Sequence, residues 1–275
     1  MQYTDVVVGT DGSASGTSAV RWAADHAART GARLRVVCVY QWHLPGPIGS
    51  AAEMDASARG QAEAVVAAAV ADAHAARPGL DVQGGAILGL PTDTLLTEAK
   101  TAALLVVGSH GRGALASALL GSVGLQVATH AEGPIVVVRG RAHTAIGPVV
   151  AGIDDGPVSE RVLSAAFVEA YRRSCGLVVV HTDEGTPDAL ARLRQRHPEV
   201  PVEVEQAAGN PADVLVAASR SAQLVVRDGR GRDSVIGALL EPVTHHLLQR
   251  ADCPVLLLRE PVPLPDEPDS DPAPH

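Results

Sequence analysis

Short, continuous apolar runs alternate along the chain with longer stretches in which apolar residues recur every three or four positions. The run DVVVG at 5–9 is rich in β-branched residues, which is typical of a strand that is buried on both faces. The segment 13–30 then brings Trp22 and several alanines to one helical face, with Ser13 or Ser15 as the N-terminal cap. The chain therefore opens with a predicted strand followed by an amphipathic helix.

The alternation of strands and helices continues as far as residue 139. A long Ala-rich segment is predicted to be a helix that stops before Pro78, and another helix is predicted to open at Pro91, because proline suits the first helical turn. Strand–helix–strand repetition favours a doubly wound α/β fold, in which helices cover both faces of a parallel sheet. The further elements predicted in this part are strands at 34–40, 82–88, 103–108 and 134–139 and helices at 50–77 and 123–131.

The chain contains this pattern twice. VVVGTDGS at 6–13 returns as VVAGIDDG at 149–156, which is a separation of 143 residues. GLPTDTLLTEAKTAALLVVG, which begins at Gly89, returns as GNPADVLVAASRSAQLVVRD, which begins at Gly209, and here the separation is 120 residues. The fall from 143 to 120 means that the second copy lacks 23 residues in its middle, where the first copy has its long helix.

Two homologous domains of unequal length follow from this repeat. We assign residues 1–142 to the first domain and residues 146–260 to the second, shortened domain. The final stretch, 261–275, is rich in Pro and Asp and has little to bury, which predicts a disordered tail.

Composition and charge exclude several classes of function. Aromatic residues make up 2% of the 275 residues, so few side chains are available on which nucleic-acid bases could stack. The net charge is −9, so the chain has no overall positive charge to attract phosphate backbones, and no nucleic-acid partner is expected. No apolar run is long enough to span a membrane, and the start lacks a secretory signal, which predicts a cytoplasmic protein without a membrane partner. The three cysteines form no CxxC pair and the histidines follow no metal-binding spacing, so we expect reduced thiols and no zinc site.

Glycines gather directly behind the apolar run at 103–108, in the segment VVGSHGRGALASALLGSVG. Glycine lets the backbone approach a ligand closely, and the free amides at the amino end of a helix bind phosphate. Ser122 stands just before a predicted helix, so it can cap that helix and offer its hydroxyl to a phosphate oxygen. Ligands of open parallel sheets bind beyond the carboxyl ends of strands, where Thr10 and Asp11 also lie.

Three phosphate-binding patterns compete for this segment. A P-loop requires a Lys after its last Gly, and the only Lys of the chain, Lys100, lies on a predicted helix, so this pattern fails. GRGALA at 111–116 resembles a dinucleotide fingerprint, but the next strand ends in Arg139 rather than an acid, and the glycines come late in the domain. The third pattern is Gly108-x2-Gly111-x9-Gly121-Ser122.

This last spacing resembles the ATP-binding signature of the universal stress protein family, G-x2-G-x9-G-[ST], and meets all of its fixed positions. The opening VVVGTDGS, the G-x-P at Gly89 and the closing GPIVVVR are also similar to family features. The resemblance covers residues 1–140 and, more weakly, 146–260, and tandem members are familiar. It implies two tandem doubly wound parallel five-stranded sheets of the adenine nucleotide α-hydrolase-like type, each with strand order 3-2-1-4-5.

The resemblance also implies roles for individual residues. Thr10 and Asp11 would lie against the nucleoside, and the backbone of Val39 would meet the adenine edge. Gly108 and Gly111 would line the ribose and the phosphates. ATP is therefore the implied ligand, with Mg²⁺ carried by the phosphates rather than by a protein cage. At the phosphate end, the implied contacts are the amides of Gly121, Ser122 and Val123, the Ser122 hydroxyl, and Arg112 as an added charge partner.

Structural roles remain open for several of these residues. Asp11 can cap the helix that follows it, and Gly108 and Gly111 can shape a turn without a ligand. His110 lies inside the glycine-rich segment and could reach a phosphate, but we expect an exposed loop residue.

The second copy departs from the signature. Its matching positions are Asp228, Gly231, Glu241 and Pro242. Glu241 puts a negative charge where a phosphate would lie, and Pro242 offers neither an amide hydrogen nor a hydroxyl. We therefore expect one nucleotide per chain, bound by the first domain. The segment RDGRGR at 227–232 is interpreted as a solvated loop.

The last strands of the two domains are expected to pair. The resemblance implies an antiparallel contact between PIVVVR at 134–139 and PVLLLR at 254–259, which would also protect an apolar sheet edge. The sequence leaves open whether two chains form a homodimer and which protein clients they meet.

No set of catalytic bases surrounds the predicted phosphate site, and the resemblance implies a nucleotide-responsive regulatory protein of the stress response. One rival is a slow Mg-dependent ATPase in which Asp11 helps to orient water. The other rival is an interaction protein that binds no nucleotide. An adenylyl-transfer enzyme is disfavoured because no S-G-G-x-D-S stretch follows the first strand.

Overall fold

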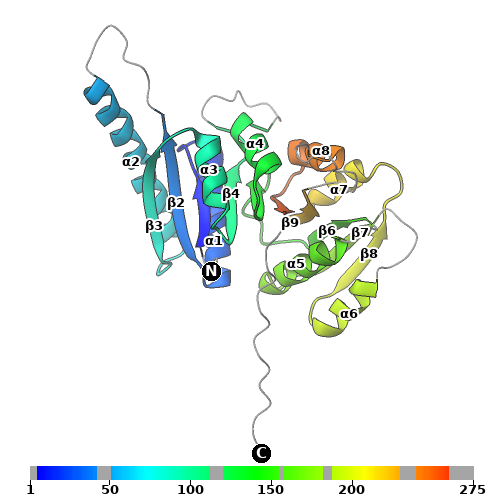
Figure 1. Ribbon diagram of the computed structural model, residues 1–275. Coiled ribbons are helices and arrows are strands. Elements are labelled where there is room, and N and C mark those ends of the chain that lie inside the picture. Colours follow the sequence, from blue (N-terminus) through cyan, green and yellow to red (C-terminus); the bar gives the residue numbers. More distant parts are fainter. Residues whose placement is uncertain are drawn as a thin grey trace, which may run out of the picture.

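The computed structural model describes residues 5–41, 51–111, 120–154, 158–181, 188–229 and 240–259, without the side chains of 51–54 and 188. Two α/β halves stand side by side (Figure 1). The first half contains β1 (Asp5–Gly9), α1 (Ala14–Thr30), β2 (Arg33–Tyr40), α2 (Ala51–Ala76), β3 (Val82–Leu88), α3 (Pro91–Ala99), β4 (Leu104–Gly108), α4 (Ser122–His130) and β5 (Ile135–Val138). The second half contains β6 (Val149–Ile153), α5 (Ser159–Arg172), β7 (Leu177–His181), α6 (Asp188–Arg196), β8 (Val202–Gln206), α7 (Pro211–Ser219), β9 (Leu224–Asp228), α8 (Pro242–Arg250) and β10 (Val255–Leu258).

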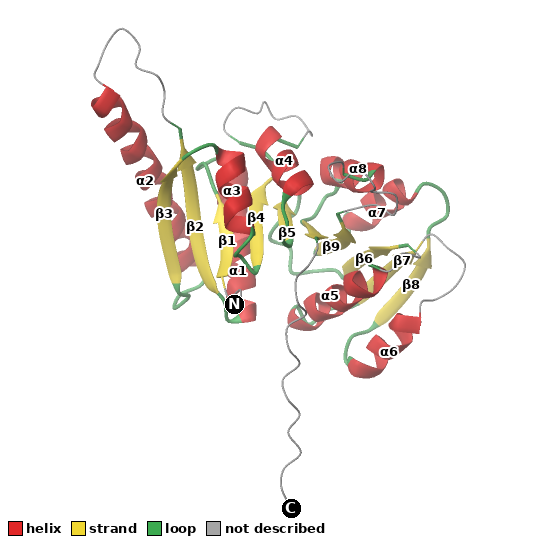
Figure 2. Cartoon of the chain, in the orientation of Figure 1, coloured by secondary structure: helices red, strands yellow, loops and turns green. Residues whose placement is uncertain are grey.

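One ten-stranded sheet runs through both halves, in the order β3-β2-β1-β4-β5-β10-β9-β6-β7-β8. Each half therefore has the predicted order 3-2-1-4-5. The strands within each half are parallel, whereas β5 and β10 pair antiparallel, with Val137 opposite Val255 and Ile135 opposite Leu257. The predicted contact between the last strands is confirmed, and it joins the two five-stranded sheets into one (Figure 2).

Local sequence signals explain where α1 begins and ends. The Ser13 side chain accepts a hydrogen bond from the Gly16 amide, so Ser13, one of the two serines that the sequence offers, is the N-cap. Gly31 follows the helix with a φ of 68°, in the left-handed region that glycine adopts without strain.

The shortened second half differs mainly in one helix. α6 has 9 residues, whereas α2, at the corresponding place between the second and third strands of the first half, has 26. This difference fits the residues that the sequence lacks in the second copy. The tail predicted at 261–275 lies outside the described residues.

Two apolar clusters cover the two faces of the sheet, and each contains residues from both halves. On one face, Val8 and Leu34 belong to the same cluster as Phe167 and Leu190. On the other face, Leu105 and Leu247 belong to a second cluster. The shared sheet thus supports continuous cores rather than two separate ones.

A buried polar cluster lies where α1 meets α5. His26 stacks on Trp22 with ring centroids 5.2 Å apart, and its Nδ1 lies 3.7 Å from Glu169 Oε2. The Arg173 guanidinium lies 5.5 Å from the Trp22 ring centroid, and its Nε donates to Glu169 at 3.2 Å. Burial lowers the pKa of His26 below 6.5, against the attraction of Glu169 and together with the repulsion of Arg173 and Arg172. Burial alone would raise the pKa of Glu169, but the charges of His26, Arg173 and Arg172 outweigh it and keep the pKa below 4.5.

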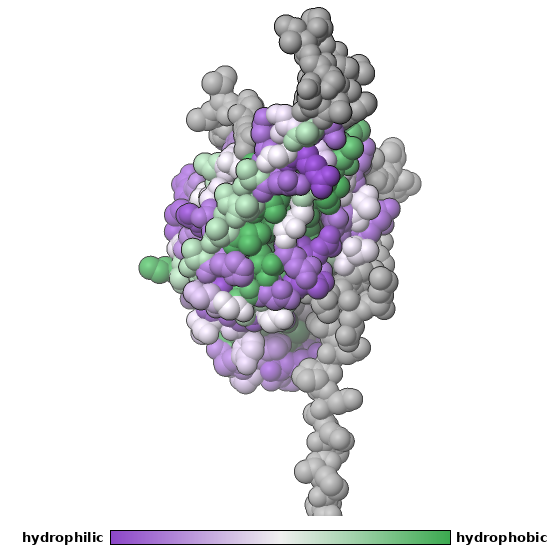
Figure 3. All heavy atoms as spheres, turned by 90° about the vertical axis from the view of Figure 1, so that its left-hand side faces the viewer, coloured by the Kyte–Doolittle hydropathy of each residue, from purple (hydrophilic) through white to green (hydrophobic). Residues whose placement is uncertain are grey.

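The β3 end of the sheet exposes apolar side chains. Figure 3 looks at this end and shows an apolar area bordered by hydrophilic residues. Leu88 and Leu90, at and just beyond the end of β3, are 53% and 58% exposed.

Among the described helices, none has the length and apolar character needed to cross a bilayer.

Candidate functional site

A cavity of about 500 Å³ opens at the carboxyl ends of β1, β2 and β4, between the starts of α1 and α4. Eight of the nine predicted site residues line it, and they come from four separate parts of the first half. These eight are Thr10, Asp11, Val39, Gly108, Gly111, Gly121, Ser122 and Val123. The ninth, Arg112, lies outside the described residues.

Thr10 and Asp11 form the turn between β1 and α1. The Thr10 amide donates to the Val37 carbonyl at 2.9 Å, which ties this turn to β2. Asp11 Oδ1 accepts from the Ser13 amide at 2.9 Å, and its Oδ2 lies 3.0 Å from where a β-carbon on Gly111 would stand. One carboxylate oxygen therefore supports the turn before the helix cap, while the other faces the cavity wall at Gly111.

Packing requires a glycine at one position of this region and leaves little room for a side chain at another. A β-carbon on Gly108 would lie 2.8 Å from the Ser15 carbonyl oxygen, so only glycine lets β4 end so close to the start of α1. A β-carbon on Gly124 would lie 3.3 Å from the Gly108 carbonyl oxygen, which brings α4 against the end of β4. A β-carbon on Gly121 would meet no atom closer than 3.5 Å, so space remains in front of it.

The amino end of α4 faces the cavity, but the prediction that Ser122 caps this helix is wrong. Gly121 is the N-cap, with φ −65° and ψ 155°, and it makes no side-chain capping bond. Ser122 is the first helical residue, so its hydroxyl stands one position too late to cap. The amides of Ser122, Val123 and Gly124 begin the helix and have no intrahelical acceptor four residues earlier. Their hydrogens and the helix dipole make this end attractive to an anion.

Ser109 and His110 add polar groups to the wall that sequence reasoning did not assign. Ser109 is buried, and its Oγ lies 2.8 Å from His110 Nδ1 and 3.4 Å from Ser15 Oγ. The expectation that His110 is an exposed loop residue is wrong, since it is half-buried and lines the cavity. The position of Ser109 directly behind β4, at the carboxyl edge of the sheet, is the signal that could have identified it.

The remaining wall is apolar. Side chains of Val37, Val39 and Val107 rise from the strands, and Pro91 and Leu95 approach from α3. Apart from Val39, these residues were predicted as ordinary strand and helix residues, because an apolar cavity wall and a protein core have the same sequence pattern.

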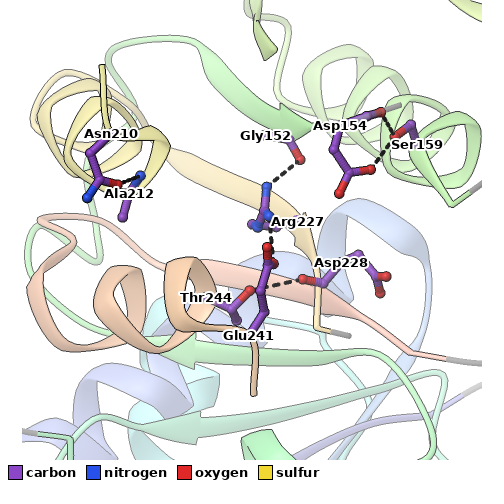
Figure 4. Close-up of polar contacts among 9 residues, drawn as sticks. All are labelled: Gly152, Asp154, Ser159, Asn210, Ala212, Arg227, Asp228, Glu241 and Thr244. Carbon is purple, nitrogen blue, oxygen red and sulfur yellow. Dashed lines mark hydrogen bonds and ion pairs between the residues drawn. The ribbon is translucent and has the colours of Figure 1, made fainter. Parts of the chain in front are cut away.

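The equivalent place in the second half is filled by an ion pair (Figure 4). Arg227 stands where the first half has Val107, and its side chain lies between β6 and the start of α8. Its Nη2 lies 2.6 Å from Glu241 Oε2, and its Nη1 donates to the Gly152 carbonyl at 3.5 Å. The interpretation of 227–232 as a solvated loop is therefore wrong for Arg227, which is 5% exposed. Residues 230–232, including Gly231 of the degenerate signature, lie outside the described residues.

Glu241 is the N-cap of α8, so its carboxylate belongs to the helix end that corresponds to Gly121 in the first half. Nearby, the Thr244 hydroxyl donates to the Asp228 carbonyl at 3.2 Å, and the Ser159 hydroxyl donates to Asp154 (Figure 4). The charge that the sequence places in this cleft is thus neutralised within the protein by Arg227. Within the described residues, no group of three or more His, Cys, Asp or Glu side chains could hold a metal ion.

The chain is an α/β protein with a doubly wound sheet, and its glycine-lined cavity lies at the carboxyl edge of that sheet, where proteins of this class commonly bind ligands. The profile of the universal stress protein family matches residues 2–139 and 183–259. A universal stress protein of Mycolicibacterium smegmatis (strain ATCC 700084 / mc(2)155) is 34% identical over 287 residues, covering 92% of this chain and 96% of the relative. The chain therefore belongs to the universal stress protein family, as a tandem of two family domains.

A solved structure shares the fold of the whole chain. The crystal structure of a universal stress protein from Archaeoglobus fulgidus DSM 4304 shares the fold with a TM-score of 0.75 at 19% identity, covering 94% of this chain and 99% of that chain. A universal stress protein solved in complex with cAMP is 32% identical, covering 50% of this chain and 98% of that chain, with a TM-score of 0.39.

Proposed function

We propose that the cavity of the first half binds one adenine nucleotide, ATP, and that nucleotide occupancy regulates the protein in a stress response. The observation that carries the proposal is the convergence of the signature residues on one cavity. Gly108, Gly111, Gly121 and Ser122 are spread over 15 residues of sequence and line the same space as Thr10 and Asp11.

The cavity suits the two ends of a nucleotide. Its volume of about 500 Å³ lies within the usual range for small-molecule sites, and its apolar wall at Val39, Pro91 and Leu95 suits an adenine ring. The amino end of α4 would receive the phosphates through the first-turn amides and the Ser122 hydroxyl. Asp11 would lie against the nucleoside, and Arg112 would add a positive charge near the phosphates.

Mg²⁺ fits this site only as a companion of the phosphates. The described residues offer no cluster of three metal-binding side chains, so phosphate oxygens and water would supply most of its ligands. The ion would neutralise part of the phosphate charge, while the protein holds the nucleotide through its backbone.

The second half is proposed not to bind a nucleotide. Arg227 and Glu241 already contact each other across the space that a nucleotide would need. We therefore propose one nucleotide per chain.

A charge substitution at the phosphate end tests the proposal. Gly121→Glu copies Glu241 into the first half and places a carboxylate at the amino end of α4. We expect ATP affinity to fall at least about tenfold, because like charges repel strongly in a partly enclosed site. Equilibrium titration with ATP measures this, and ADP, AMP and cAMP in the same assay show how much each phosphate arrangement contributes.

The matched control is Gly60→Glu, which adds the same charge at an exposed position of α2 with open space around it. This variant should bind ATP as tightly as the unmodified chain. Equal binding by Gly121→Glu and Gly60→Glu would contradict the site. Phosphate release by the unmodified chain and by Asp11→Ala, with protein in excess, separates simple binding from slow hydrolysis.

A further inference from the structure

Two arginines connect the halves reciprocally. Arg139 follows β5 and Arg259 follows β10, at matching positions of the repeat. The Arg259 guanidinium donates to the carbonyl oxygen of Ala128 in α4, and the Arg139 guanidinium donates to the carbonyl oxygen of Leu248 in α8. Ala128 and Leu248 are themselves matching positions, 120 residues apart. Each half therefore holds the last turn of a helix that belongs to the other half.

The carbonyl that Arg259 reaches needs a partner. The last four carbonyl groups of an α-helix have no intrahelical donor, and a positive charge near them is favoured by the helix dipole. In α4 the Val127 carbonyl is satisfied by the Ala131 amide, and the next carbonyl, that of Ala128, accepts from Arg259. The second half thus completes the hydrogen bonding at the carboxyl end of this helix.

The position of Arg259 is fixed by its surroundings. Its side chain is buried, with only 3% of the residue exposed. A β-carbon on Gly229 would lie 2.5 Å from Arg259 Nε, so the glycine at the end of β9 makes room for the guanidinium. Arg161 of α5 donates to the Arg259 carbonyl at 3.2 Å. The second half therefore fixes the main chain of Arg259 through Arg161 and leaves space for its side chain at Gly229.

The opposite end of α4 is the end that faces the cavity. There the Gly121 amide donates to the Ser109 carbonyl at 2.7 Å, and the first-turn amides begin. α4 has only 9 residues, so it is about 13 Å long, and displacement of one end moves the other. We infer that Arg259 is a positioning residue, through which the second half sets the phosphate-facing end of α4 in the first half.

The expected effect of Arg259 on ATP binding rests on the proposed nucleotide site, whereas the contact between Arg259 and α4 does not. It gives the second half a role although its own cleft is filled. Arg139 makes the mirror contact to α8, whose amino end is Glu241 and already pairs with Arg227. Arg139 is therefore a matched control, with the same residue type, the same kind of contact and no proposed ligand at the far end.

The experiment compares Arg259→Met, Arg259→Lys and Arg139→Met in the full chain. Hydrogen exchange of the α4 and α8 amides reports each helix separately, and ATP titration reports the cavity. We expect Arg259→Met to speed exchange in α4 and to weaken ATP binding about fivefold to tenfold. Arg139→Met should speed exchange in α8 and change ATP affinity less than about twofold.

Arg259→Lys restores a positive charge and a donor, so its exchange and affinity should lie between those of Arg259→Met and the unmodified chain. If Arg259→Met does not fold, Arg259→Lys against the unmodified chain makes the same comparison. Unchanged α4 exchange in the Arg259 variants overturns the inference, and so does an equal loss of ATP affinity in Arg139→Met. If the unmodified chain binds no adenine nucleotide, the proposed function fails, while α4 exchange still decides whether Arg259 positions the helix.

Discussion

At the scale of single residues, the halves differ in charge at Val107 and Arg227, which occupy matching positions on β4 and β9. Val107 lines a cavity, whereas Arg227 spans the equivalent space and pairs with Glu241. The side chains of Arg227 and Glu241 are 6% and 23% exposed. Removing one partner of such a buried pair lowers stability, because the charge that remains is still desolvated and has lost its partner.

A double-mutant cycle tests this pair. Glu241→Gly alone leaves the Arg227 guanidinium buried without its carboxylate, so we expect a loss of about 2–4 kcal/mol of unfolding free energy. Arg227→Val with Glu241→Gly copies the first half and removes both charges, so it should recover part of that loss. Urea unfolding of the two single variants, the double variant and the unmodified chain gives the coupling energy. Strictly additive effects would show that the pair does not stabilise the second half.

At the scale of elements, the strands and most helix bounds could be predicted from the sequence, since buried parallel strands are continuous apolar runs. The segment 5–9 is β1 as predicted, and the helix predicted at 50–77 is α2 at Ala51–Ala76. The amino end of α4 shows where prediction from the sequence fails. A serine beside a predicted helix looks like a cap, but one residue of shift makes Gly121 the cap.

The candidate site shows the same limit for individual side chains. The glycines of the signature could be found because spacing along the chain defines them. Leu95 could not, because a leucine on a helix face has the same pattern whether it lines a cavity or a core. Arg227 was misinterpreted because its burial depends on Glu241, which lies 14 residues further along the chain.

At the scale of the whole molecule, the halves are joined by a common sheet, by the two reciprocal arginines and by the polar cluster between α1 and α5. α1 extends from the cavity, where Gly16 lies, to His26 in this cluster. His26 is surrounded by Arg173 and Arg172 as well as Glu169, so a positive charge on the His26 ring is unfavourable.

This cluster predicts a pH dependence of stability. Because burial keeps the pKa of His26 below 6.5, the unfolded chain takes up a proton near pH 6.5 that the folded chain does not. Stability should therefore fall as the pH drops below about 6.5, by at most about 1.4 kcal/mol per pH unit for this one group. The lowered pKa of Glu169 adds a further loss below pH 4.5.

Urea unfolding between pH 7.5 and 5.5 measures this dependence. His26→Gln removes the titrating group, so it should flatten the curve between these pH values. The same change at the exposed His74 of α2 is the matched control for replacing a histidine by glutamine. An identical slope in the His26 variant and the unmodified chain would place the pH dependence elsewhere.

The central claim is that the first half holds one adenine nucleotide and the second half holds none. A crystal structure determined with saturating ATP tests it most directly. The account predicts density for one nucleotide, with its phosphates at the amino end of α4 and its base toward Val39, and the ion pair of Arg227 and Glu241 intact. Density for a nucleotide beside Glu241, or a first-half cavity without nucleotide at saturation, would contradict the account.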